Sequence, residues 1–368
     1  MINLEHLADE NKRLREALLK KEKREYKGTA PERDELLKHL ETLGSKRAVA
    51  RIYGKDEKQI RRWCIDRDIG DGKESTRAII ESLRFDNLKF KKIKLKPAVD
   101  PKGETLIIDL GDWHAGKEIK DEHGKVVFNE KILTERISEG LFPEILSLLD
   151  TRIKKATKIT EIVILLVGDM ADGSNIYPTQ QYNQYIAPPR QVELCVELII
   201  PLIENLVDRK LPVNIYAVRG NHGRGLKLES PENNWDTMLY LWLQRETRKL
   251  PNVTLEFSDL DYMNFKIRGW NYHIRHIAPE QDDTAAGRAK FAGWKDIHKF
   301  NAICYGHYHH FGITDFYGGR RFRNGCVSGW DDLSEKMAKI ADPVQLIWGC
   351  SNKRVCSFIY PVDLKGNV

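Results

Sequence analysis

The sequence predicts a layered α/β sandwich for residues 103–368, preceded by a smaller, all-helical N-terminal region. From Glu104 onward, apolar runs typical of buried strands end in Gly-containing turns, and long amphipathic segments lie between them. Strands and helices first alternate, which is typical of a sheet covered by helices, and later the chain consists mostly of strands.

Each strand of the sandwich is predicted from an apolar run, and each helix from an amphipathic segment. Strands are expected at residues 105–110, 162–167, 213–218, 253–257, 263–267, 272–277, 302–305, 321–327 and 355–360. Helices are expected at residues 130–156, 190–210, 233–250 and 285–298, where apolar residues recur with the helical period.

The N-terminal region begins with a predicted helix within residues 1–25. Leu4, Leu7, Asn11, Leu14 and Leu18 recur at alternating steps of three and four, which is the spacing of a heptad seam. A single Asn in such a seam fixes the register of two-stranded coils, so this pattern favours a homodimer through residues 2–22. Three heptads are marginal for a coiled coil, and a helix packed on its own domain is the equal alternative.

Residues 31–69 are expected to form three short helices, at 31–43, 45–53 and 56–66, separated by glycine-containing turns. Five cations lie on or around the third helix, where a DNA-reading element needs charge against phosphates: Lys55, Lys58, Arg61, Arg62 and Arg67. The stretch resembles the trihelical helix-turn-helix domains of transposases and phage DNA-binding proteins. The competing interpretation is a small protein-interaction module.

Residues 70–102 read as a linker that carries one helix, at 75–83, and then a basic run at 89–96. Lysines alternate with apolar residues in this run, which is typical of an edge strand protected by charge. An extension of a phosphate-binding surface is the alternative.

The positive charge of the chain is concentrated at its N-terminal end. Residues 1–100 contain 26 Lys and Arg against 19 Asp and Glu, whereas residues 101–368 contain 34 against 35. This asymmetry favours a polyanion-binding appendage on a nearly neutral body, with an ordinary solvated surface as the alternative.

Composition also excludes several classes of protein. The sequence contains no run of roughly 18 apolar residues as a membrane span requires, and its start lacks the layout of a secretory signal, so a cytoplasmic protein is expected. The six cysteines are scattered without a Cys-x-x-Cys pair, which favours reduced, mostly buried thiols over a zinc ribbon or a disulfide framework.

Five polar clusters follow predicted strands, at the carboxyl ends where open α/β sheets bind their ligands. In chain order they are Asp112-Trp113-His114, Gly168-Asp169, Gly220-Asn221-His222, His276 and Gly306-His307-Tyr308-His309. Each one alone is a common turn or a core histidine. Five in succession, each after an apolar strand, indicate a shared site.

This succession of motifs resembles the calcineurin-like metallophosphoesterase superfamily, whose pattern is Asp-x-His, Gly-Asp, Gly-Asn-His, a strand-end His and Gly-His-x-His. Every motif is present in order within residues 105–330. The resemblance implies a four-layer sandwich of two β-sheets flanked by helices, with two divalent metal ions between the sheet ends. It implies Asp112, His114 and His309 as ligands of one ion, Asn221, His276 and His307 as ligands of the other, and Asp169 as the bridge.

Phosphoester hydrolysis explains why such a site needs these residue types. Attack by water requires hydroxide at neutral pH and cations that neutralise the developing charge, and two metal ions provide both. Imidazole, carboxylate and amide ligands without thiolate suit manganese, iron or zinc better than calcium, and Mn²⁺ is the ion we expect in the test tube, with Mg²⁺ also possible.

Four histidines in or beside these motifs receive different interpretations. The resemblance gives His222 a role beside Asp169 and Asn221 in catalysis, as a non-ligand that protonates the leaving oxygen or stabilises charge, with a structural role as the alternative. His273 and His276 share one predicted strand, and His276 is preferred as the ligand because it lies at the strand end. His310 is expected to be a bystander.

Residues 172–191 form a long polar loop beside the predicted site, with Tyr177, Tyr182 and Tyr185 as its aromatic residues. Long loops at such places usually serve function, so the tyrosines are candidates for stacking nucleobases, and Arg190 or Arg224 for holding a phosphate. A loop that packs by its own aromatic residues is the alternative.

Three functions compete on this reading. The first is a two-metal DNA nuclease or phosphodiesterase, and the second is a phosphomonoesterase with an N-terminal dimerisation adaptor. The third is a DNA-binding assembly factor with a vestigial site, which the intact ligand set disfavours. The domain order is similar to that of phage and mobile-element metallophosphoesterases and, more distantly, to that of the repair nucleases of the superfamily. Fold alone does not select the substrate.

Overall fold

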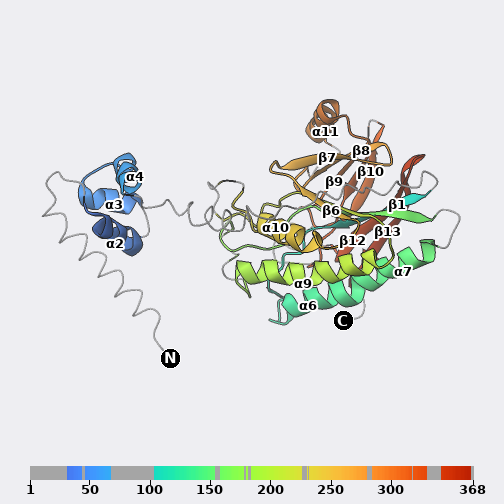
Figure 1. The fold of residues 1–368 in the computed structure, drawn as a ribbon, viewed down its shortest axis with the longest axis horizontal. Helices are drawn as coiled ribbons and strands as arrows, with labels where there is room; N and C mark the ends of the chain where they lie inside the picture. Colours follow the sequence, from blue (N-terminus) through green and yellow to red (C-terminus); the bar gives the residue numbers. More distant parts are fainter. Residues whose placement is uncertain are drawn as a thin grey trace. The chain divides into compact units, whose positions relative to one another are not determined.

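The computed structural model describes residues 31–43, 46–67, 103–153, 158–177, 180, 184–225, 230, 232–279, 284–316, 318–329 and 341–365. Contacts within the chain divide it into two compact units, Met1–Ile93 and Lys94–Val368, which are described separately (Figure 1). The predicted helix at 1–25, with its proposed dimer contact, and the predicted linker at 70–102 lie outside the described residues.

The described part of the first unit consists of three short helices, α2 (Arg33–Leu43), α3 (Lys46–Tyr53) and α4 (Glu57–Asp66). Their apolar faces meet in one small core, built from Leu36, Val49, Ala50, Ile52, Tyr53, Ile60, Trp63 and Cys64. The turn between α3 and α4 contains Gly54, whose φ of +61° favours glycine. Asp56 starts α4 by accepting a 2.7 Å hydrogen bond from the Gln59 backbone N–H.

The second unit contains a six-stranded sheet with the order β13-β12-β1-β4-β5-β6. In this order the strands are Arg354–Asp363, Val344–Ser351, Glu104–Leu110, Ile159–Leu166, Val213–Ala217 and Val253–Phe257. β1, β4, β5 and β6 run parallel, whereas β12 and β13 are antiparallel additions beside β1. The carboxyl ends of the four parallel strands therefore share one edge of the sheet.

A five-stranded sheet packs against this one, with the order β10-β11-β9-β8-β7. In this order the strands are Gly312–Phe316, Gly319–Arg323, Ala302–Tyr305, Trp270–Arg275 and Tyr262–Ile267. β8, β9 and β11 are parallel, so β8 and β9 also end at a common edge. A separate hairpin is formed by β2 (Ile119–Lys120) and β3 (Val126–Phe128).

Helices cover the outer faces of both sheets, as Figure 1 shows. The six-stranded sheet packs against α6 (Glu130–Glu135), the π-helical turn η1 (Arg136–Leu141), α7 (Phe142–Ile153), α9 (Pro188–Val207) and α10 (Trp235–Thr247). α11 (Ala285–His298) packs on the other sheet around Phe291 and Phe300. A further apolar layer, including Ile107, Val163 and Trp348, lies between the sheets. The predicted four-layer α/β sandwich is thus confirmed.

Several elements differ from the sequence prediction. The single helix expected at 130–156 contains the π-helical turn η1 between α6 and α7, and the strand expected at 321–327 is β11, Gly319–Arg323. β2, β3, β10 and β12 were not predicted. β12 was missed because Gln345 and Gly349 interrupt its apolar run, but Gln345 is buried and its Nε2 donates to the carbonyls of Gly111 and Gly325.

In the part of the chain that the structure describes, no helix has the length and apolar character needed to cross a membrane.

Candidate metal centre

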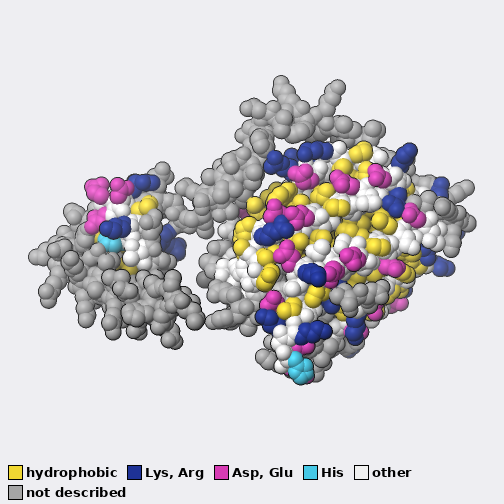
Figure 2. Space-filling model, turned by 90° about the horizontal axis from the view of Figure 1, so that it is seen from below, with side chains coloured by type: hydrophobic (Ala, Val, Ile, Leu, Met, Phe, Trp, Pro, Cys, Tyr) yellow, Lys and Arg dark blue, Asp and Glu magenta, His cyan; other side chains and the backbone are white. Residues whose placement is uncertain are grey.

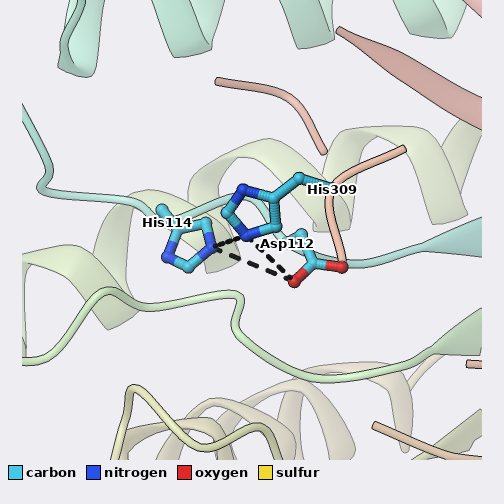
Figure 3. Close-up of side chains that lie close together, drawn as sticks. All are labelled: Asp112, His114 and His309. Carbon is cyan, nitrogen blue, oxygen red and sulfur yellow. Dashed lines mark hydrogen bonds and ion pairs between the residues drawn. The ribbon is translucent and has the colours of Figure 1, made fainter. Parts of the chain in front are cut away.

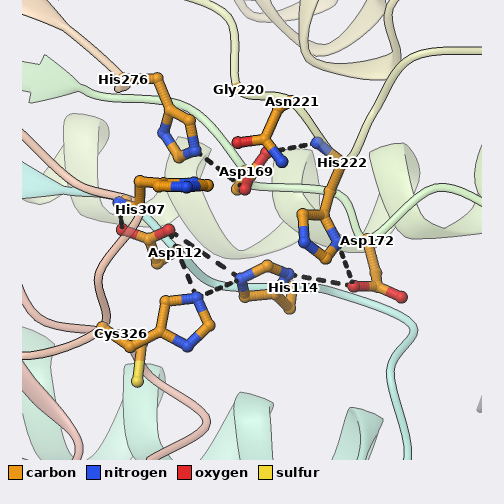
Figure 4. Close-up of polar contacts among 12 residues, drawn as sticks. Asp112, His114, Asp169, Asp172, Gly220, Asn221, His222, His276, His307 and Cys326 are labelled. Carbon is orange, nitrogen blue, oxygen red and sulfur yellow. Dashed lines mark hydrogen bonds and ion pairs between the residues drawn. The ribbon is translucent and has the colours of Figure 1, made fainter. Parts of the chain in front are cut away.

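The predicted clusters meet at one place, where strands of both sheets end (Figure 4). Asp112 and His114 follow β1, Asp169 follows β4, and Asn221 and His222 follow β5. From the other sheet, His276 follows β8, and His307 and His309 follow β9. The chain therefore assembles the site from residues up to about 200 positions apart because parallel strands deliver their carboxyl ends to one edge.

One group of side chains consists of Asp112, His114 and His309 (Figure 3). The two imidazole Nε2 atoms lie 3.0 Å apart. Oδ1 of Asp112 lies 3.9 Å from Nε2 of His114 and 3.7 Å from Nε2 of His309. Asp112 and His114 are fully buried. The three converging nitrogen and oxygen atoms form a candidate site for one divalent ion.

A second group consists of Asp169, His276 and His307. Nε2 of His276 lies 2.9 Å from Oδ2 of Asp169, and the rings of His276 and His307 have their centroids 5.2 Å apart. Nδ1 of His276 donates a 2.8 Å hydrogen bond to the Val167 carbonyl, which turns Nε2 toward the group. Figure 4 shows Asn221 beside this group.

The backbone of the site lies in a conformation that residues other than glycine rarely adopt. Asp112, His114, Asp169, His307 and His309 all have φ between 48° and 76°. Such left-handed residues persist only where the surrounding structure holds them, and they cluster at functional sites. Five of the seven predicted ligands share this feature. The fold therefore holds these loops in an unfavourable backbone conformation that directs their side chains into the site.

Two glycines allow the strand ends to approach one another. A Cβ atom at Gly168, whose φ is +92°, would meet the backbone of Gly220, and a Cβ at Gly220 would meet Asp169. The Gly residues of the Gly-Asp and Gly-Asn-His motifs are therefore required by close packing between neighbouring loops.

Hydrogen bonds fix one oxygen of each carboxylate and leave the other directed into the site. Oδ1 of Asp169 accepts from the His222 backbone N–H at 2.8 Å, and Oδ2 of Asp112 accepts from the His307 backbone N–H at 2.9 Å. Among the described residues, Oδ1 of Asp112 and Oδ1 of Asn221 are buried without a hydrogen-bond partner. A buried oxygen without a partner is costly, and a bound cation would remove that cost.

The ionisation of the acids and histidines also fits a cation site. Burial raises the pKa of Asp112 to about 7, because the negative charge is poorly solvated there. Burial alone would raise the pKa of Asp169, but the neighbouring His276 and His222 outweigh it and hold the pKa well below its usual range. Burial would lower the pKa of His276, but Asp169 raises it to about 9. Metal ions would replace these protons as the counter-charge.

The donor set contains nitrogen and oxygen atoms only. Cys326 is drawn nearby in Figure 4, but its sulfur accepts the Gly329 backbone N–H at 3.1 Å, and it belongs to none of the candidate ligand groups. The residues present fit two divalent ions of the manganese, iron or zinc type.

His222 lies beside the candidate ligands, and its ring is held by a residue that sequence reasoning missed. Oδ1 of Asp172 lies 3.0 Å from Nδ1 of His222 and 3.0 Å from Nδ1 of His114. Burial would lower the pKa of His222, but Asp169 and Asp172 raise it above its usual value. A signal for Asp172 was present, because it is a second carboxylate three residues after Asp169 in the same loop.

Asp236 is a second missed residue. It lies in the first turn of α10, fully buried, and its Oδ2 accepts backbone N–H groups of Asp169 at 2.9 Å and Gly220 at 2.8 Å. Its Oδ1 accepts from Met170 at 3.1 Å and Ala171 at 3.3 Å. One carboxylate thus joins the loops after β4 and β5. No local signal identifies it, since its partners are up to 67 positions away.

His273 lies away from the candidate ligand groups, stacked against His298 and Phe300, whereas His276 belongs to one of them. Nδ1 of His310 donates to the Tyr308 carbonyl at 2.7 Å.

The two arginines proposed as phosphate ligands differ in their surroundings. Arg224 is half-buried beside the site, with its Nε donating to the Asn221 carbonyl at 2.9 Å. Arg190 forms ion pairs with Glu130, Glu193 and Glu197, so its charge is already neutralised on α9. Arg224 remains the better candidate of the two.

The fold and this site define a metal-dependent phosphoesterase, and comparison with known proteins gives the family. Residues 106–311, more than half of the chain, match the calcineurin-like phosphoesterase family, and the chain belongs to it. The general reaction is therefore metal-dependent hydrolysis of phosphoester bonds. A comparison with curated proteins gives no sequence match.

Solved structures similar to this chain include an archaeal phosphodiesterase, at 13% identity and a TM-score of 0.35, covering 70% of this chain and 99% of that one. Zinc-complexed Vps29 from Entamoeba histolytica has 11% identity and a TM-score of 0.31, with coverage of 70% and 99%. A predicted phosphoesterase from Streptococcus pneumoniae has 11% identity and a TM-score of 0.29, with coverage of 71% and 98%.

Proposed function

We propose that this protein is a DNA phosphodiesterase, most simply a nuclease, that works with two divalent ions, of which Mn²⁺ is the best candidate. The observation that carries the proposal is the pairing, in one chain, of a three-helix unit that carries exposed cations with groups of candidate metal ligands. The third helix of that unit presents cations to solvent, and DNA binding by small helical units depends on such contacts with phosphates.

The cations around α4 are not equivalent. Lys55, Lys58 and Arg62 are exposed. Arg61 is also exposed but lies 3.2 Å from Glu57, one helical turn away. Arg67 is half-buried, and its Nε donates to the Pro31 carbonyl at 2.5 Å. Lys58 and Arg62 are therefore the side chains that this proposal places first against DNA phosphates.

The second unit is nearly neutral, so its net charge alone would not bind it to a polyanion. Residues 101–368 contain nearly equal numbers of basic and acidic residues. On the face that Figure 2 shows, Lys and Arg side chains are interspersed with Asp and Glu. Affinity for DNA is therefore assigned to the basic unit, and the chemistry to the metal centre.

In the proposed centre, one ion would be held by Asp112, His114 and His309 and the other by Asn221, His276 and His307, and Asp169 would contribute to both. When bound, the two ions supply hydroxide at neutral pH and neutralise charge on the phosphoryl group. His222, held by Asp172, is placed to give a proton to the leaving oxygen. Arg224 is the candidate for contact with a further phosphate of the strand.

The alternative is a phosphomonoesterase in which the first unit is a dimerisation or docking module. A panel of substrates with Mn²⁺ separates the two functions: p-nitrophenyl phosphate, bis(p-nitrophenyl) phosphate, and single- and double-stranded DNA. We expect the diester and DNA to be hydrolysed faster than the monoester. Preference for the monoester, with DNA left uncut, would contradict the nuclease proposal.

Charge reversal in the intact chain tests the role of the first unit. Lys58→Glu with Arg62→Glu should weaken DNA binding and lower the slope of log affinity against log salt by about 0.9 for each DNA phosphate that the variant no longer neutralises. Hydrolysis of bis(p-nitrophenyl) phosphate should not change. The matched control is Lys353→Glu with Arg354→Glu, two exposed cations at the β12–β13 turn. Equal effects of the two double variants would argue for a docking or dimerisation module instead.

A further inference from the structure

Tyr177 makes a direct contact with a proposed ligand of the second ion. Nδ2 of Asn221 donates a 2.7 Å hydrogen bond to the Tyr177 hydroxyl oxygen. Oδ1 of Asn221, the atom that a metal ion would use, is buried and has no hydrogen-bond partner among the described residues. The phenol therefore lies one amide group away from the proposed metal position.

The same tyrosine also touches the proposed proton donor. Its ring lies 4.7 Å from the His222 ring, centroid to centroid, at an angle of 40°. Tyr177 is nevertheless 38% exposed. It therefore contacts both Asn221 and His222 and remains accessible to solvent.

The backbone of Tyr177 is anchored to the site by Gln180, which is buried. Oε1 of Gln180 accepts the backbone N–H groups of Ile176 at 2.7 Å and Tyr177 at 3.0 Å. Nε2 of Gln180 donates to the Asp172 carbonyl at 2.5 Å. One buried side chain thus joins the Tyr177 backbone to the loop of Asp172, while the phenol itself is held by its hydrogen bond with Asn221.

We propose that Tyr177 is a catalytic residue that donates its hydroxyl proton in a hydrogen bond to a phosphoryl oxygen of the substrate. A phenol oxygen both accepts and donates. Asn221 uses its acceptor side, which leaves the hydrogen to point away from the amide. The negatively charged oxygens of a phosphoryl group at the metal centre are acceptors for it, and such a donor is worth most where charge develops during reaction. The inference rests on the proposed ligand role of Asn221.

The test compares Tyr177→Phe, which keeps the ring and loses the hydroxyl, with the matched control Tyr360→Phe. Tyr360 lies on β13, and its hydroxyl donates to Glu144 on α7, outside the candidate ligand groups. Binding of inorganic phosphate to the Mn²⁺-loaded full chain is measured by calorimetry, and Mn²⁺ binding is measured separately. Steady-state hydrolysis of bis(p-nitrophenyl) phosphate gives kcat and KM.

We expect Tyr177→Phe to bind two Mn²⁺ ions as the unaltered protein does, and to lose phosphate affinity and kcat/KM by about 10- to 100-fold, since a hydrogen bond to a charged group is removed. Tyr360→Phe should lose neither. Phosphate affinity within about twofold of the unaltered protein would overturn the proposal. Loss of a Mn²⁺ ion in Tyr177→Phe would also overturn it, because the tyrosine would then act through Asn221.

These outcomes are distinct from failure of the proposed function. If the unaltered protein hydrolyses the small diester but leaves DNA uncut, the nuclease proposal fails, and the comparison of Tyr177→Phe with Tyr360→Phe still decides the role of Tyr177.

Discussion

Oδ1 of Asp172 lies 3.0 Å from Nδ1 of His222, so a buried carboxylate fixes the ring of the proposed proton donor. The same oxygen also lies 3.0 Å from His114, a proposed ligand. We predict that Asp172→Asn lowers kcat for bis(p-nitrophenyl) phosphate by about 10- to 100-fold, because residues that orient ligands and catalytic histidines typically have effects of this size. The measurement is steady-state hydrolysis at saturating Mn²⁺. An unchanged kcat would mean that the contact has no role in the reaction.

His222→Ala should separate metal binding from chemistry. A donor to the leaving oxygen stabilises the transition state without holding the ions, so both Mn²⁺ ions should remain while the rate falls roughly 10²- to 10⁴-fold. Metal content by elemental analysis and the rate with the small diester check both halves. His310→Ala is the control, since His310 lies next to His309 but bonds to the Tyr308 carbonyl. If His222→Ala loses a metal ion, the residue is a ligand or a structural support.

Asp169→Asn should abolish activity. Asp169 lies 2.9 Å from His276 and is the residue proposed to be shared by both ions. Its replacement by a neutral amide weakens both sites at once. Calorimetry with Mn²⁺ should give two ions for the unaltered chain and fewer for the variant. Asp315→Asn, at an exposed position of β10, should retain both. A single ion in fully active protein would rule out the two-metal centre.

Asp236→Asn should reduce stability and metal affinity together, although Asp236 is not a proposed ligand. The carboxylate accepts four backbone N–H groups from the loops after β4 and β5. An amide accepts with only one of its two polar atoms, so buried donors lose their partner at a cost of about 1–3 kcal/mol. Urea unfolding in chelator and a Mn²⁺ titration measure the two effects. The control is Asp296→Asn, at an exposed position of α11. Equal stability and equal Mn²⁺ affinity in the two variants would mean that Asp236 does not support the site.

The sequence was sufficient to predict which candidate ligands the fold brings together, because each one follows directly on the strand that positions it. Asp112 and Asp169 come within three residues of buried strands, and the sandwich brings those strand ends together. Contacts that cross between loops could not be predicted in the same way. Asp236 sits on a helix 67 positions after Asp169, and its short polar segment reads as an ordinary helix start. The structure was also needed to connect Tyr177 with Asn221.

The fold was predicted less completely where local patterns conflict with burial. A strand is recognised by its apolar run, but β12 contains Gln345, whose polar atoms are satisfied only by loops far away in sequence. The helix predicted at 130–156 was correct in position, but its π-helical turn at Arg136–Leu141 has no periodicity signal. There Nη1 of Arg136 donates to the carbonyls of Val327 and Ser328, contacts that the local sequence does not specify.

His273 should make the stability of the protein depend on pH. This histidine is fully buried in the five-stranded sheet, and its Nδ1 lies 2.8 Å from Oδ1 of Asn264. Burial, with help from His298 and Arg275, lowers the pKa of His273 to about 3. Between that value and the ordinary histidine pKa of about 6.5, the unfolded chain binds a proton that the folded chain does not. The free energy of unfolding contributed by this group therefore falls as the pH is lowered through this window.

His273→Phe should remove that part of the pH dependence, because phenylalanine fits the stack with Phe300 and does not titrate. For a single such group the slope is at most about 1.4 kcal/mol per pH unit. Urea unfolding at several pH values between 4 and 7, in chelator so that metal binding does not contribute, gives the difference between variant and unaltered chain. That difference should favour the variant increasingly as the pH falls. The exposed His123→Phe is the control, and a constant difference for His273→Phe across the range would show that His273 is protonated as easily in the folded chain as in the unfolded one.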